Sequence, residues 1–87
     1  MDVITKTIIK IAKKLQNIDL TEDDIKNGLR FDTLNIDSID KLEILIFIED
    51  DIRGMELPDF DKLDLQDLNE LWNYLYEYLP DKYKNKI

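Results

Sequence analysis

Hydrophobic side chains recur every three or four residues in two long segments, and this spacing predicts a helical chain. Such spacing places apolar side chains along one face of a helix. The first segment contains Ile4, Ile8, Ile11, Leu15 and Ile18. The last segment contains Leu65, Leu68, Trp72, Leu75 and Leu79. We therefore expect an all-α fold.

A third helix is predicted between these segments, around the apolar run Ile44–Ile48. This run could alternatively form a buried strand, but its charged flanks extend a helical period on both sides. Asp37 and Ser38 are candidate caps for this helix, with Asp40 in its first turn, where the helix dipole favours negative charge. Gly54 is expected to end it.

The predicted helices form one domain over residues 1–87. We place them at roughly 3–17, 38–53, 59–63 and 65–79. Asp2 can cap the first helix, and Pro80 ends the last one. Residues 19–36 lack periodicity and predict a long loop with room for one helical turn. Three longer helices and a short third helix give a small four-helix bundle.

Acidic residues outnumber basic ones, which restricts the possible partners. Twelve basic and twenty acidic residues give a net charge of -8. The first 18 residues carry +3 and the last eight carry +2, so residues 19–79 carry -13. Such a charge repels nucleic acids and anionic membranes and favours basic protein surfaces. We expect a monomer with basic protein partners, without nucleic acid binding or membrane insertion.

The chain contains neither Cys nor His. It therefore lacks disulfides, a thiolate nucleophile, the usual zinc ligands and the usual general base of serine nucleophiles. No apolar run exceeds five residues, far fewer than the roughly 20 that cross a bilayer, and the first residues do not resemble a signal peptide. These features predict a soluble cytoplasmic protein and exclude most enzyme classes.

Two apolar stripes run along the predicted second helix. At about 100° per residue, one stripe forms an arc that should face the core: Ile44, Leu45, Ile48 and Ile52. The other stripe consists of Ile39, Leu42 and Ile46, and the acids beside it are Glu43, Glu49 and Asp50. This second stripe is either a docking surface for a basic partner or simply covered by the bundle.

The segment Leu34–Ile44, Leu-Asn-Ile-Asp-Ser-Ile-Asp-Lys-Leu-Glu-Ile, resembles the phosphopantetheine attachment site of acyl and peptidyl carrier proteins. The core of that site is Asp-Ser-Leu followed by an amphipathic helix, and the resemblance extends over nearly the whole chain. It implies a four-helix bundle of acyl-carrier type with 4'-phosphopantetheine bound covalently to Ser38. It also implies that Asp37 helps to position magnesium or the transferase. The implied partner contacts are Ile39, Leu42 and Ile46, with Glu43, Glu49 and Asp50 as acidic recognition residues.

The resemblance implies a non-catalytic carrier of a thioester-linked acyl intermediate in fatty-acid, polyketide or related biosynthesis. A phosphopantetheinyl transferase would supply the base, magnesium and coenzyme A, so the absence of His and Cys is expected. Acyl-loading and acyl-processing enzymes with basic docking surfaces would be the other partners. A helix N-terminus tolerates the phosphodiester that modification creates. We further expect that Leu45, Ile48 and Leu75 line a cavity for the acyl chain.

Two residues depart from the common Leu-Gly-x-Asp-Ser-Leu pattern of the family. Asn35 replaces the Gly, and Asn is among the few other residues that tolerate a left-handed backbone. Ile39 replaces the Leu and adds a β-branch. These departures suggest a carrier outside the commonest fatty-acid type.

Other interpretations of the same residues remain open. The chain could be a cofactor-free acidic adaptor or inhibitor that binds a basic partner through Ile39, Leu42 and Ile46. Ser38 could be only a helix cap. A hydrolase that uses Ser38 would need a desolvated Lys as its base. The acids around residues 59–64 lack the central Gly and terminal Glu of a calcium loop, so we predict no metal site.

Overall fold

The structure is a computed structural model that describes residues 1–58 and 64–85. Within these residues the chain forms five α-helices and no β-strand, which confirms the all-α prediction. The helices are α1 (Val3–Gln16), α2 (Glu22–Lys26), α3 (Ser38–Asp51), α4 (Leu68–Glu77) and α5 (Asp81–Lys84). The helix expected at 59–63 lies outside the described residues. None of the described helices is long and apolar enough to cross a membrane.

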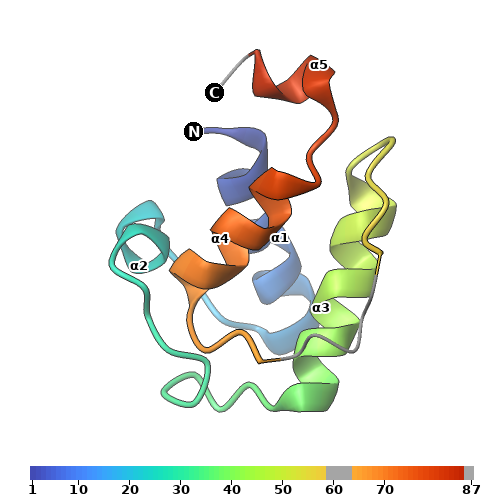
Figure 1. Ribbon diagram of the computed structural model, residues 1–87. Coiled ribbons are helices and arrows are strands. Elements are labelled where there is room, and N and C mark those ends of the chain that lie inside the picture. Colours follow the sequence, from blue (N-terminus) through green and yellow to red (C-terminus); the bar gives the residue numbers. More distant parts are fainter. Residues whose placement is uncertain (59–63, 86–87) are drawn as a thin grey trace.

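Helix α1 is the element against which α2, α3 and α4 pack. It contacts α2, α3 and α4, and Figure 1 shows it behind α4 and between α2 and α3. The predicted cap is present: Asp2 Oδ1 accepts a hydrogen bond from the backbone N–H of Thr5 at 2.8 Å. Asn17 adopts a left-handed conformation, with φ 54°, and ends α1 one residue before the predicted end.

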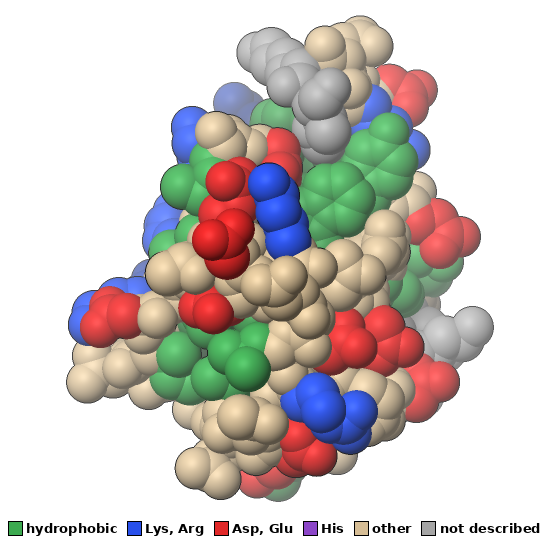
Figure 2. Space-filling model, turned by 90° about the vertical axis from the view of Figure 1, so that its left-hand side faces the viewer, with side chains coloured by type: hydrophobic (Ala, Val, Ile, Leu, Met, Phe, Trp, Pro, Cys, Tyr) green, Lys and Arg blue, Asp and Glu red, His purple; other side chains and the backbone are tan. Residues whose placement is uncertain are grey.

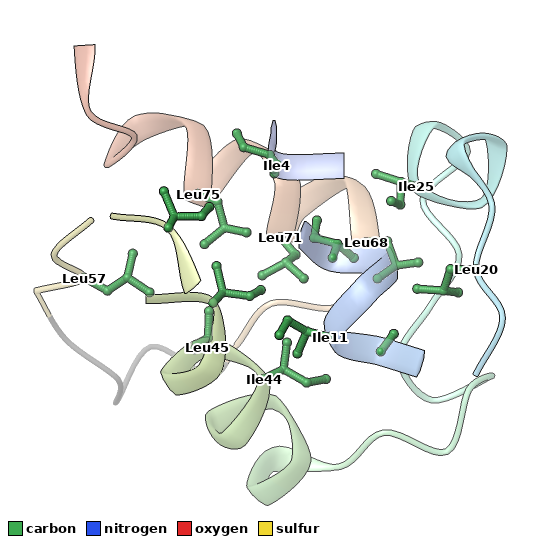
Figure 3. Packing of buried hydrophobic residues seen from close by; sticks show 14 of the residues in the cluster. Ile4, Ile11, Leu20, Ile25, Ile44, Leu45, Leu57, Leu68, Leu71 and Leu75 are labelled. Atoms are coloured by element: carbon green, nitrogen blue, oxygen red, sulfur yellow. The ribbon is translucent and has the colours of Figure 1, made fainter. Parts of the chain in front are cut away.

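The core forms where the apolar faces of α1, α3 and α4 meet. Figure 3 shows the labelled core side chains Ile4 and Ile11 from α1, Ile44 and Leu45 from α3, and Leu68, Leu71 and Leu75 from α4. Leu20, Ile25 and Leu57 enlarge this core. Burying one such side chain contributes roughly 1.5–3 kcal/mol, so these contacts are the main source of stability.

The long connection between α1 and α3 contains the single helical turn that the sequence allowed, α2. Beyond α2, an isolated antiparallel bridge pairs Arg30 with Asp67. In this bridge, the N–H of Phe31 donates to the carbonyl of Gln66, and the N–H of Leu68 donates to that of Leu29, both at 3.0 Å. The bridge thus ties the connection to the start of α4.

Three further helix ends differ from the predictions, besides the end of α1. Helix α4 begins at Leu68 rather than 65, because Asp67 accepts a hydrogen bond from the N–H of Glu70 and caps the helix there. Helix α3 ends at Asp51 rather than 53, because Ile52 leaves the helix in an extended conformation and is buried. Helix α4 ends at Glu77, and Pro80 then precedes α5, which the sequence analysis did not predict.

Candidate functional site

A tight turn before α3 sets the position of Ser38. Phe31 and Ile36 are buried at its two ends, and the N–H of Ile36 donates to the carbonyl of Phe31 at 2.9 Å. Between them Asn35 adopts φ 59°, in the left-handed region. Asn accepts this conformation more readily than other non-Gly residues, because its short polar side chain can hydrogen-bond locally. This position is the one at which the family resemblance predicts Gly.

A capping box holds the first turn of α3. Asp37 Oδ1 accepts a hydrogen bond from the N–H of Asp40 at 2.9 Å, and Asp40 Oδ2 accepts one from the N–H of Asp37 at 3.3 Å. These reciprocal bonds satisfy two backbone donors at the helix start. Asp37 is therefore the cap, and Ser38 is the first residue inside the helix.

The Ser38 side chain is exposed, and Ser38 is the only serine in the chain. Its hydroxyl makes no hydrogen bond with any residue that the structure describes. Backbone N–H groups in the first helical turn lack intrahelical acceptors and, together with the helix dipole, favour a phosphate group.

The second apolar stripe of α3 lies largely in solvent. Ile39 is 73% exposed and Ile46 is 46% exposed, whereas Leu42 is half-buried. Ile44 and Ile48, from the opposite stripe, are buried in the core together with Leu45 and Ile52. The separation of α3 into a core face and an outer apolar face is therefore present in the structure.

The three acids beside the outer stripe have different surroundings. Glu43 and Asp50 are exposed. Glu49 is half-buried, and its Oε2 accepts a hydrogen bond from the backbone N–H of Leu57 at 2.7 Å. The carboxylate of Glu49 thus fixes the segment that follows α3, which leaves Glu43 and Asp50 as the acids that are open to a partner.

An open groove of about 400 Å³ continues the outer stripe toward the end of α3. Its lining residues are Ile46, Phe47, Glu49, Asp50, Met55 and Glu56. Sequence reasoning missed Phe47, Met55 and Glu56. Phe47 belongs to the apolar run of α3, but its place beside the groove depends on how the chain folds back after Gly54, which helical periodicity does not indicate.

Of the three residues expected to line a cavity for the acyl chain, Leu45 borders a small void. A void of about 10 Å³ lies next to Leu45, and its other lining residues are Phe31, Lys41, Ile44, Leu65 and Leu71. Ile48 and Leu75 do not line it and are completely buried. A void of this size scarcely holds one water molecule.

A second face of the molecule, on the side of α2, carries charges of both signs beside exposed hydrophobic side chains (Figure 2). A hollow of about 240 Å³ between α1, α2 and α4 is lined by Asp2, Thr5, Ile25, Lys26, Asn69, Trp72 and Asn73. Trp72, which lies on the predicted apolar face of the last helix, is half-buried and packs against the core. Its indole N–H lies 3.2 Å from Asp2 Oδ1 and 3.1 Å from Thr5 Oγ1.

Two carboxyl groups in the described part of the chain have lowered pKa values. Burial alone would raise the pKa of Asp2, but hydrogen bonds from the backbone and hydroxyl of Thr5 and from the Trp72 indole lower it overall. The pKa of Asp32 is lowered mainly by its hydrogen bond with the Arg30 guanidinium, which in turn has a raised pKa. No cluster of acidic side chains in the described part of the chain is arranged to hold a metal ion.

Comparisons with protein-family models, with curated proteins and with solved structures find no match for this chain.

Proposed function

We propose that this protein is an acyl carrier that holds its cargo as a thioester on a 4'-phosphopantetheine arm attached to Ser38. The observation that carries the proposal is the position of this single serine. It is exposed at the first residue of a 14-residue helix, directly after a capping aspartate and a left-handed Asn35. The resemblance of residues 34–44 to the family's attachment site supports the same assignment.

The proposed attachment divides the chemistry between this chain and its partners. A phosphopantetheinyl transferase would supply the base, magnesium and coenzyme A, while the first turn of α3 accommodates the phosphodiester. Asp37 Oδ1 is used in the cap, and Oδ2 accepts no hydrogen bond from the described residues. Asp37 can therefore cap the helix with one oxygen and help to position magnesium or the transferase with the other. The protein itself presents the cofactor and catalyses nothing.

We assign the outer face of α3 to the enzymes that load and process the cargo. Ile39 and Ile46 offer apolar surface for burial, and Glu43 and Asp50 lie beside them to orient a basic partner. Half-buried Leu42 completes the stripe. Glu49 acts indirectly, because its hydrogen bond with the backbone N–H of Leu57 fixes the segment that follows α3. The net charge of -8 favours the same class of partner.

The finer fold assignment is part of this proposal. Helices α1, α3 and α4 correspond to the three longer helices of a carrier-type four-helix bundle, with α2 inside the long connection. Helix α5 has no counterpart in such a four-helix bundle, and none of its residues is buried in the described part of the structure.

The decisive experiment is intact mass spectrometry after incubation with a broad-specificity phosphopantetheinyl transferase, magnesium and coenzyme A. The mass should increase by one phosphopantetheine. Ser38→Ala should abolish this increase, while Thr33→Ala, which removes an exposed hydroxyl five residues away, should not. Circular dichroism would verify that each variant is folded. Absence of any mass increase in the folded wild-type protein would overturn the proposal.

The exposed Ile39 and Ile46 equally favour a second candidate, a cofactor-free acidic adaptor that binds a basic protein. For an adaptor, Ser38→Ala would leave partner binding unchanged, and Ile46→Glu would abolish it. For a carrier, transfer of cargo to the partner would require Ser38.

A further inference from the structure

Lys41 links three segments of the chain next to the proposed attachment site. It lies three residues after Ser38 and four before the buried Leu45, and hence on the same side of α3 as both. Its Nζ donates a hydrogen bond to the backbone carbonyl of Leu65 at 2.9 Å and lies 5.3 Å from the centre of the Phe31 ring. One side chain thereby connects α3, the turn that precedes it and the segment that leads into α4.

The void of about 10 Å³ lies at the junction of the same three segments. Among the described residues that line it, Lys41 is the only charged one, and the other five are hydrophobic. The aliphatic stem of Lys41 supplies apolar wall, while its ammonium group reaches out to the Leu65 carbonyl. An apolar chain that entered the core from Ser38 along this side of α3 would have to displace this side chain.

We propose that Lys41 is a latch that keeps an alkyl chain attached at Ser38 out of the core. This inference rests on the carrier function proposed above and determines how the cargo is held. For the latch to open, the ammonium group of Lys41 must leave both the Leu65 carbonyl and the Phe31 ring. The partly buried carbonyl of Leu65 then lacks its hydrogen-bond donor, which costs free energy. The latch therefore disfavours insertion of a plain alkyl chain and leaves the cargo at the surface, accessible to partner enzymes.

The test uses an attachment that needs no transferase. Because the chain has no cysteine, Ser38→Cys creates a single thiol that can be alkylated with N-ethylmaleimide or N-octylmaleimide. The readouts are the NMR methyl signals of Ile44, Leu45 and Leu71 and the melting temperature of each adduct. With Lys41 present, the ethyl and octyl adducts should give the same interior signals and the same melting temperature.

Removal of the latch should change this result. In Lys41→Met, which keeps a long side chain but no charge, the octyl adduct should shift the interior methyl signals and melt at a higher temperature than the ethyl adduct. Lys41→Ala should behave like Lys41→Met, and Lys26→Met, which removes a lysine on α2, should behave like the parent protein. The two latch variants together keep the test valid if one of them folds poorly.

Interior shifts that depend on chain length in the protein with Lys41 would overturn the latch. Their absence from both latch variants would overturn it as well, because the barrier would then lie elsewhere. Neither result bears on whether a transferase modifies Ser38, so the latch and the proposed function can fail separately.

Discussion

At the scale of single residues, Asn35 determines how the chain enters α3. Its positive φ lets the turn that begins at Phe31 close while Ile36 stays buried and Asp37 reaches its capping position. The side chain at position 35 is exposed, so the requirement at this position is for a backbone conformation rather than for a packed side chain.

We expect substitutions of Asn35 to follow backbone preference. Asn35→Gly should change the free energy of unfolding by no more than about 0.5 kcal/mol relative to the wild type, since Gly adopts a positive φ without steric cost. Asn35→Ala should lower it by about 1 kcal/mol, because Cβ disfavours the left-handed conformation. Urea denaturation would measure both changes, and equal stability of the Gly and Ala variants would contradict this account.

The local sequence predicted the cap of α3, because the capping contacts join residues within three positions of each other. Asp37 and Asp40 form the predicted first turn, and Asn35 adopts the left-handed conformation that Asn tolerates in place of Gly. Lys41 was not singled out, because its contacts are with Phe31 and with Leu65, which is 24 positions further along the chain. Helical periodicity carries no information about such distant contacts.

At the scale of elements, α3 is the helix that must serve two surfaces. Its inner side chains share the core with those of α1 and α4, while its outer stripe lies largely in solvent. Ile39 and Ile46 are exposed on this stripe, which is the part of α3 to which we assign partner docking.

We expect equivalent truncations on the two sides of α3 to have different effects. Ile48→Ala should lower the free energy of unfolding by about 2–5 kcal/mol, because it leaves a cavity in the core. Ile46→Ala should lower it by less than about 1 kcal/mol, because half of that side chain is already in solvent. Chemical denaturation of both variants would compare them, and a large loss for Ile46→Ala would show that this residue is part of the core.

Helix interiors were predicted more accurately than helix ends. The spacing of the apolar residues predicts the interiors of α1 and α3. The positions of the helix ends depend on contacts that this spacing does not reveal. The start of α4 shifts to Leu68, where Asp67 caps the helix beside the bridge to Arg30. The end of α3 shifts because Ile52 is buried outside the helix.

At the scale of the whole molecule, Asp2 joins the start of the chain to α4. Its carboxylate caps α1 and accepts a hydrogen bond from the Trp72 indole, across 70 positions of sequence. The lowered pKa of Asp2 means that the folded protein favours the charged carboxylate. This contribution to stability is present above the ordinary pKa of 3.8 and is lost as the pH falls through the lower folded value.

We expect Asp2→Asn to be about 1 kcal/mol less stable than the wild type at neutral pH, since a charge-assisted hydrogen bond becomes a neutral one. The difference should shrink when unfolding is measured in increasingly acidic buffer below the ordinary pKa. Asp50→Asn is the control, because its carboxylate makes no hydrogen bond or ion pair with the described residues. A difference between Asp2→Asn and wild type that is constant with pH would contradict the assigned pKa shift.

The indole of Trp72 also gives this protein a natural optical sensor. It is the only tryptophan in the chain, is half-buried, and stacks on the Tyr76 ring with 5.3 Å between ring centroids. Its emission therefore reports whether the N-terminal end of α1 is docked on α4. Release of that end would expose the ring to water and shift its fluorescence to longer wavelength. Loosening of this junction, by acid or by a partner, can thus be followed in real time without any added label.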